Sequence, residues 1–179
     1  MRKLRAALDV LYLLGGIGGA LSLALIALVI AAQVGGRFLG HAVAGADDLT
    51  AFAVAASALL PLAYAFRHGA HIRVDLVLGR LSGAPRRVME ALALLLAALI
   101  TAAFAWSLLD LAADSLEFDD VAQGSVAWKL WPPQALCGLG AALFALALLD
   151  DLVVHLAGGT PSYRRHEEKS AMDRAAEEL

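Results

Sequence analysis

The sequence predicts an all-α integral membrane protein with four transmembrane helices. Of its 179 residues, 60% are hydrophobic and only 17% are charged, whereas about 25% of the residues of a typical soluble domain are charged. Four runs contain no Asp, Glu, Lys or Arg at all: 10–36, 49–66, 91–109 and 130–149. Each run reaches the ~18 apolar residues that mark a candidate transmembrane helix. This pattern excludes a soluble enzyme, a nucleic-acid-binding protein and a disulfide-linked secreted domain.

The ends of these runs give the expected bounds of the spans. We expect spans at about 10–34, 49–66, 88–109 and 133–155, in one membrane domain over 1–157 that is followed by a polar cytoplasmic tail at 158–179. The first run is longer than the apolar core of a signal peptide, and three further runs follow it, so we expect it to remain as a helix.

Two features predict how the first two spans pack. Gly15 and Gly19 form a GxxxG pair, and small residues let helices approach closely in lipid. We therefore expect these glycines in a helix contact. Pro61 lies inside the second span, where it removes an amide donor, so we expect a kink there.

The third span is expected to continue beyond its apolar run. Asp110, Asp114 and Glu117 recur at i, i+4 and i+7 on one helix face, whereas Leu109, Ala112 and Leu116 lie on another. This spacing predicts an amphipathic extension between the third and fourth spans, either upright or lying at the interface.

The positions of Lys and Arg predict the orientation. The N-terminus, the loop between the second and third spans, and the tail together carry 12 of them, against two, Arg37 and Lys129, in the other two loops. By the positive-inside rule, both termini lie in the cytoplasm. The opposite, outer side is acidic, which serves either solubility or docking of a basic partner; its acids are Asp47, Asp48, Asp110, Asp114, Glu117, Asp119 and Asp120.

The sequence contains no pattern of residues that indicates catalysis. No run has an ionisable residue near its centre, although ion and proton pathways need one. The five histidines lie in loops or at span ends, and the single cysteine, Cys137, cannot form an intramolecular disulfide. We therefore expect no enzyme activity, no cofactor, no metal site and no nucleic-acid partner. Such a bundle supports a transport path in a partner more readily than it forms one.

A few charged residues have candidate structural roles. Arg37 either pairs with Asp47 or Asp48, or is an interfacial arginine whose charge reaches the headgroups. Asp48 is also suited to the N-cap or first turn of the second span. Asp150 and Asp151 lie near the inner end of the fourth span, where the helix dipole disfavours acids. We expect at least one of them to pair with a basic residue: Arg67, Arg73, Arg86 or Arg164.

Three stretches carry a resemblance to a known family. They are Arg37-Phe38 after the first span, Asp47-Asp48-Leu49-Thr50 at the start of the second, and Phe66-Arg67-His68-Gly69-Ala70-His71-Ile72-Arg73-Val74-Asp75 after it. In these features the chain resembles the small membrane subunit (DctQ-type, or Q subunit) of tripartite ATP-independent periplasmic (TRAP) transporters. The resemblance covers about residues 8–155. It departs from the family pattern at Asp48, usually Glu, and at Ala56 and Pro61, where Trp and Gly are frequent.

The resemblance implies the function of a non-catalytic permease subunit. In such systems a periplasmic binding protein captures an organic anion, such as a carboxylate, and a large (M-type) membrane subunit imports it with sodium. The small subunit packs on the large one and helps to receive the binding protein. Arg67, His71, Arg73 and Asp75 would then contact the large subunit or lipid headgroups, although a solvated basic loop that only enforces topology has the same composition.

Two other functions remain as alternatives. A membrane anchor of a respiratory or redox complex would need paired midplane histidines or a quinone pocket. A self-sufficient small carrier would need a polar midplane. The sequence contains neither feature in its apolar runs.

Overall fold

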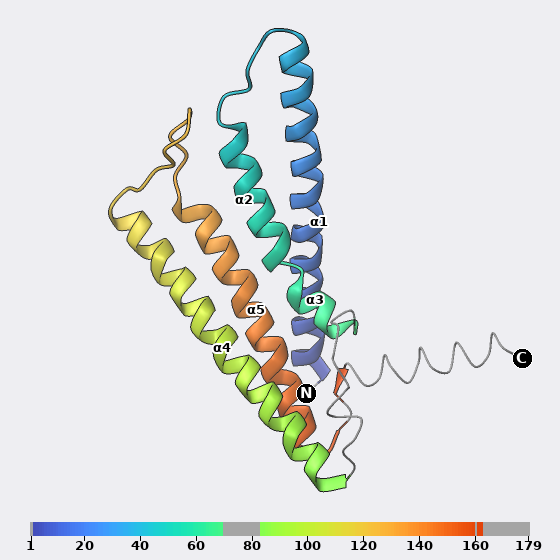
Figure 1. The fold of residues 1–179 in the computed structure, drawn as a ribbon. Helices are drawn as coiled ribbons and strands as arrows, with labels where there is room; N and C mark the ends of the chain where they lie inside the picture. The colour runs from blue at the N-terminus through green and yellow to red at the C-terminus, as the bar shows by residue number, and fades with distance from the viewer. Residues whose placement is uncertain (1, 70–82, 160, 163–179) are drawn as a thin grey trace, which may run out of the picture.

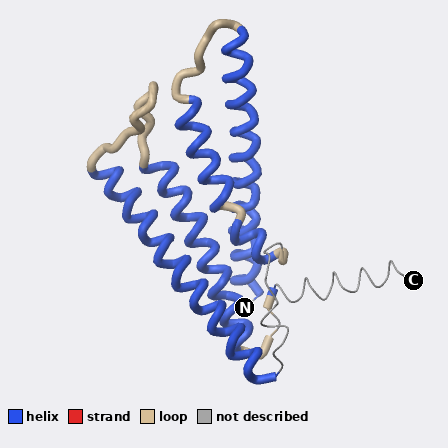
Figure 2. Tube along the Cα trace, viewed as in Figure 1, coloured by secondary structure: helices blue, strands red, loops and turns tan. Residues whose placement is uncertain are grey.

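The structure is a computed structural model that describes residues 2–69, 83–159 and 161–162, with side chains from residue 7. It contains five helices, which Figure 1 labels: α1 (Arg2–Phe38), α2 (Ala46–Leu59), α3 (Leu62–Arg67), α4 (Gly83–Glu117) and α5 (Trp131–Leu156). The described residues form no strand (Figure 2), and one isolated antiparallel bridge joins Val121 to Lys129.

Four helical segments are long and apolar enough to cross a membrane. They are Ala7–Phe38, Ala46–Arg67, Gly83–Glu117 and Trp131–Leu156, of which the second comprises α2 and α3. The all-α fold with four transmembrane-capable helices is therefore confirmed. The helices extend beyond the uncharged runs, because a run marks only the part of a helix that lies in hydrocarbon. With 37 residues, α1 is ~55 Å long.

The helices are packed in a row rather than around a common axis. α4 packs along α5, α5 contacts α2 and α3, and α1 packs against α2 and α3 (Figure 1). α5 is therefore the most buried span, whereas α1 and α4 expose most of their apolar side chains. The connections 39–45 and 118–130 lie together at one end, here named the acidic end. The opposite end is named the Arg67 end.

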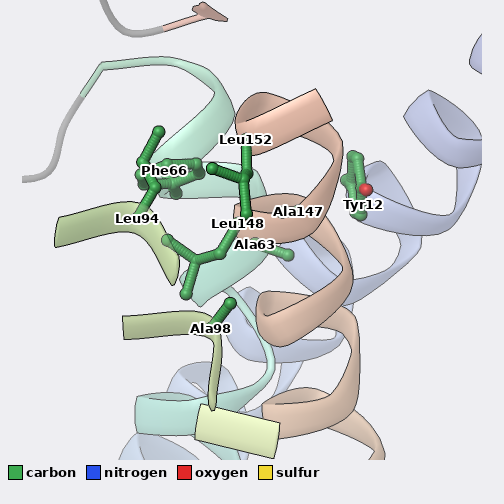
Figure 3. Close-up of a cluster of buried hydrophobic side chains, with 8 residues drawn as sticks. All are labelled: Tyr12, Ala63, Phe66, Leu94, Ala98, Ala147, Leu148 and Leu152. Carbon is green, nitrogen blue, oxygen red and sulfur yellow. The ribbon is translucent and has the colours of Figure 1, made fainter. Parts of the chain in front are cut away.

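The packed core lies towards the Arg67 end. Figure 3 shows side chains from α1, α3, α4 and α5 that meet there: Tyr12, Ala63, Phe66, Leu94, Ala98, Ala147, Leu148 and Leu152. Three of the eight are alanines, which let the helix axes approach closely. In lipid this close packing supplies the dispersion energy that holds helices together, since burial from water contributes little there.

The second span breaks at Leu60–Pro61. α2 ends at Leu59 and α3 begins at Leu62, with Pro61 at φ −81° and ψ −4°. Pro61 has no amide hydrogen to continue the helical ladder, and its ring crowds the preceding turn. The interruption expected at this proline is thus a break between two helices.

Three glycines press against this break. A Cβ added to Gly15 would lie 2.6 Å from the carbonyl oxygen of Leu60, and one added to Gly19 would lie 2.8 Å from Cδ of Pro61. From α5, a Cβ on Gly140 would lie 2.9 Å from the carbonyl of Leu59. We call Gly15, Gly19 and Gly140 the glycine clamp. It brings the backbones of α1, α2 and α5 together, which explains the small residues at these positions.

The amphipathic extension is the upright end of α4, which continues as one helix to Glu117. Ala112 and Ser115 are buried, whereas Leu109 and Leu116 are exposed, at 36% and 58%. The buried face follows a spacing of four and seven residues set by contact with α5, at Glu90, Leu94, Ala98, Ala105 and Ala112. Leu116 falls outside this stripe.

The glycine clamp predicts that two glycine substitutions in α1 differ in their effect on stability. Gly15→Ala should lower the free energy of unfolding by about 1–3 kcal/mol, because the methyl group overlaps a backbone oxygen that cannot rotate away. Gly35→Ala is the matched control, since a Cβ there meets nothing within 4 Å. It should leave stability unchanged or raise it by about 1 kcal/mol through helix propensity. Thermal unfolding in detergent measures both, and equal shifts would contradict the clamp.

Candidate functional site

Arg67, the last residue of α3, joins three helices at the Arg67 end. Its Nη1 lies 2.7 Å from Oδ2 of Asp150 and 3.6 Å from Oδ1 of Asp151, both on α5. Its Nη2 donates to Oδ1 of Asp9 on α1, at 2.9 Å. We call these four residues the Arg67 cluster. The planar guanidinium can hold several carboxylates at fixed angles, which a lysine cannot do. Asp150 and Asp151 lie more than one turn before the end of α5 at Leu156, so their burial, rather than the helix dipole, is what requires this basic partner.

The Arg67 cluster is largely sheltered from solvent. The side chain of Arg67 is 13% exposed, that of Asp150 18% and that of Asp151 0%, whereas Asp9 is open at 59%. The guanidinium carbon also lies 5.5 Å from the ring centroid of buried Tyr12, within range of a cation–π contact. Removing the cation would therefore leave two poorly solvated carboxylates facing each other.

Asp151 also fastens the chain that follows α5. Its carboxylate accepts hydrogen bonds from Oγ of Ser162 at 2.6 Å and from the amide of Ser162 at 3.1 Å. The chain can return because Gly158 has φ +78° and Gly159 N donates to the carbonyl of Val154, as in a Schellman motif. The start of the tail is thus attached to the Arg67 cluster.

A second buried acid links α4 to α5 at the same end. Glu90 is 3% exposed, and its Oε1 lies 3.1 Å from Nε of Arg86. Its Oε2 is 3.8 Å from Nδ1 of His155, whose Nε2 lies 2.9 Å from the carbonyl oxygen of Arg87. Charged and polar contacts therefore connect every described helix that reaches this end, either directly or through a neighbour.

Sequence reasoning missed part of this end. Asp9, Glu90, Tyr12 and Ser162 were not among the predicted site residues. Asp9 and Glu90 each stand directly before an uncharged run, and that position at the edge of a span was the available signal. The predicted loop residues His71, Arg73 and Asp75 lie outside the described residues.

At the acidic end, the structure gives Asp47 a different partner from the one proposed. Oδ1 of Asp47 accepts a hydrogen bond from Nε2 of Gln33 at 2.7 Å. No ion pair within 4.0 Å joins Arg37 to Asp47 or Asp48, all of which are described, so the pairing is wrong. α1 continues past the start of α2, and Arg37 is four residues, or ~6 Å, further along it than Gln33. Arg37 is exposed, as in the alternative of an interfacial arginine.

Asp48 helps to join the two connections. It lies in the first turn of α2, where the helix dipole favours an acid, while Gly45 is the N-cap. The carboxylate of Asp48 lies so close to Gly124 that a side chain at 124 would overlap it. The amide of Gly45 donates to Oγ of Ser125 at 2.7 Å. The α1–α2 and α4–α5 connections are therefore in direct contact.

The other predicted acids form an exposed group beside these connections. Asp119 has φ +56° and pairs with Lys129, across the short bridge between Val121 and Lys129. All five acids of this group are exposed: Asp110, Asp114, Glu117, Asp119 and Asp120. An acidic surface of this kind can attract a basic protein over a distance of about one Debye length.

Within the described ranges, no three His, Cys, Asp or Glu residues are grouped so that they could hold a metal ion. The ionisable groups lie at the two ends of the spans, and Cys137 is buried in α5. What the arrangement does chemically is to bind helices to each other at one end and to present negative charge at the other.

Arg67→Gln should destabilise the protein by about 3–5 kcal/mol, because it leaves sheltered Asp150 and Asp151 without their cation. Lys129→Gln removes a cation from an exposed pair, so the loss there should be about 0–1 kcal/mol. The unfolding temperature of both variants in detergent measures the difference. A decrease for Lys129→Gln as large as that for Arg67→Gln would contradict a structural role for the Arg67 cluster.

Comparison with known proteins identifies a family. A search of curated proteins found no match. The chain does match the family described as "Tripartite ATP-independent periplasmic transporters, DctQ component", over residues 26–158. The matched range includes α2, α3, α4, α5 and three of the four members of the Arg67 cluster. Because this match extends over about three-quarters of the 179 residues, the chain belongs to the DctQ component family of the tripartite ATP-independent periplasmic transporters.

Proposed function

We propose that this small TRAP permease subunit packs on a large (M-type) membrane subunit and helps it to receive a periplasmic binding protein. The complex would import organic anions, such as carboxylates, together with sodium across the bacterial inner membrane. Members of the DctQ family are components of transporters and not enzymes. The observation that carries the proposal is the combination of large exposed apolar helix faces with spans that have no charge in their middle.

The uncharged middles of the spans support an accessory role. A path for sodium or an organic anion through this chain would need polar groups near the membrane centre. Residues 10–36 of α1 and 91–109 of α4 include no Asp, Glu, Lys, Arg or His. The transport path is therefore assigned to the large subunit.

The exposed faces of α1 and α4 support packing on a partner in the membrane. Leu21 and Leu28 of α1 are 64% and 69% exposed, and Ile100 of α4 is 62% exposed. Because the helices are arranged in a row, either outer helix can lie flat against a larger bundle. Lipid would then cover the remaining side.

The acidic end supports a role in receiving the binding protein. The distribution of Lys and Arg favours cytoplasmic termini, and this orientation would put the acidic end in the periplasm. Acidic residues contribute little to orientation, so their excess there needs another explanation. We propose that they attract a basic patch on the binding protein.

Copurification tests the accessory role. When expressed with its large subunit, the chain should purify as a complex, and vesicles should take up the organic anion only when both subunits and the binding protein are present. Vesicles that contain this chain alone should show no uptake. Uptake by the chain alone would contradict the proposal.

Neutralising the acidic end tests the docking role. A variant with Asp110→Asn, Asp114→Asn and Glu117→Gln should slow association of the binding protein, most clearly at low salt, because exposed charges act mainly on the association rate. The control is Glu167→Gln, Glu168→Gln and Asp173→Asn, which removes three charges from the tail. Surface-immobilised complex and soluble binding protein give the rates. Equal rates for the two variants would contradict docking at this face.

A further inference from the structure

An apolar groove opens between α1, α2 and the start of α5, next to the acidic end. It has a volume of about 580 Å³ and lies between Leu25 of α1, Phe52 of α2, and Pro133 and Leu136 of α5. In Figure 1, α2 and α5 diverge towards the acidic end, in the region where these residues lie. We propose that this groove binds one phospholipid, with an acyl chain in the groove and the phosphate at Lys129.

The depth of the groove indicates an occupant from one membrane leaflet. Its lining on α2 extends from Leu49, near the start of the helix, to Ala56, a distance of ~10 Å. On α1 it reaches Ser22, which is close to the middle of the uncharged run 10–36. The groove therefore extends from the interface to about the middle of the ~30 Å hydrocarbon core.

The glycine clamp closes the groove at its deep end. Just beyond Ala56, the break at Leu60–Pro61 meets Gly15 and Gly19 of α1, while Gly140 of α5 meets Leu59. Backbone contact at this level leaves no room for a longer occupant. A transmembrane helix of a partner protein would need a continuous groove along the whole span, so an acyl chain fits better.

The chemistry changes from apolar to polar in the direction that a phospholipid requires. Ser22 lines the deep part, but its hydroxyl donates within α1 to the carbonyl of Gly18, so it presents no free donor to the groove. At the mouth, the lining includes Lys129 and Trp128, a pair of side chains typical of the membrane interface.

Lys129 can bind a phosphate without leaving its present partner. It is 47% exposed and pairs with exposed Asp119. An ammonium has three donors, and one carboxylate oxygen uses only one of them. Two donors remain for a phosphate oxygen, and the exposed pair is weak enough to adjust.

Lipid retention by the full-length chain tests the inference. The protein is purified in mild detergent, incubated with phosphatidylglycerol or with diacylglycerol that has the same acyl chains, and examined by native mass spectrometry. The wild type should retain one phosphatidylglycerol and much less diacylglycerol. Leu136→Trp fills the groove and should weaken retention roughly tenfold or more, the effect of losing about two buried methylenes.

Control variants distinguish lipid that is bound in the groove from lipid that is bound elsewhere on the apolar surface. Leu139→Trp adds the same side chain to an exposed site on α5 outside the groove lining, and it should retain lipid like the wild type. Lys129→Gln should abolish the preference for phosphatidylglycerol over diacylglycerol, and Lys129→Arg should preserve it. If Leu136→Trp does not fold, Leu25→Trp fills the same groove from α1.

Three results would overturn the inference. Equal retention by Leu136→Trp and Leu139→Trp would show that no lipid occupies the groove. Equal retention of diacylglycerol and phosphatidylglycerol by the wild type would show that Lys129 does not bind the phosphate. Loss of the large subunit from the complex on Leu136→Trp, with no change in bound lipid, would assign the groove to a protein partner instead.

Discussion

The contact between three glycines and one broken helix determines how the other spans can be placed. Pro61 interrupts the second span, and Gly15, Gly19 and Gly140 allow the backbones of α1 and α5 to reach that interruption. In lipid no hydrophobic force drives helices together, so such close approach is what makes packing favourable. The same contact directs α3 away from the axis of α2 and brings Arg67, at its end, next to the acids of α5.

The electrostatics of the two ends follow from this placement. A buried ion pair is weak evidence for net stability, because desolvation offsets much of the attraction. The Arg67 cluster is better explained as a device for specificity: only one arrangement of α1, α3 and α5 gives Asp9, Asp150 and Asp151 the same cation. The contacts of Glu90 with Arg86 and His155 fix the position of α4 against α5 in the same way. At the acidic end the two connections are joined by the contact of Gly45 with Ser125. The charged groups there, such as Lys129 with Asp119, form exposed pairs that contribute little to stability.

The sequence predicted the spans better than the contacts between them, and the reason is physical. The absence of charge is a local property, so the uncharged runs located all four spans and the family motifs added the class of protein. A contact depends on two distant positions. Gly15 and Gly19 predicted a contact, but nothing in the sequence identified Gly140 as the third member of the clamp. The proposed pair of Arg37 with Asp47 or Asp48 was wrong, because Gln33, one turn earlier in α1, is the residue that lies opposite Asp47 and binds it.

The position of the clamp also explains why the protein has two different ends. The helices α2 and α5 diverge from the clamp towards the acidic end (Figure 1). Towards the Arg67 end, alanines such as Ala147 keep the helix axes close, and Phe66 and Leu148 fill the remaining space. Towards the acidic end, α2 and α5 separate over residues such as Ala53 and Ala56, which are too small to fill it, and a groove remains. An empty groove of this size in a membrane is unfavourable, because its walls lose dispersion contacts. An acyl chain of a surrounding lipid restores those contacts. The groove thus exists because small residues face it. Alanines are common throughout the spans, so the amino-acid composition alone did not predict where a groove would form.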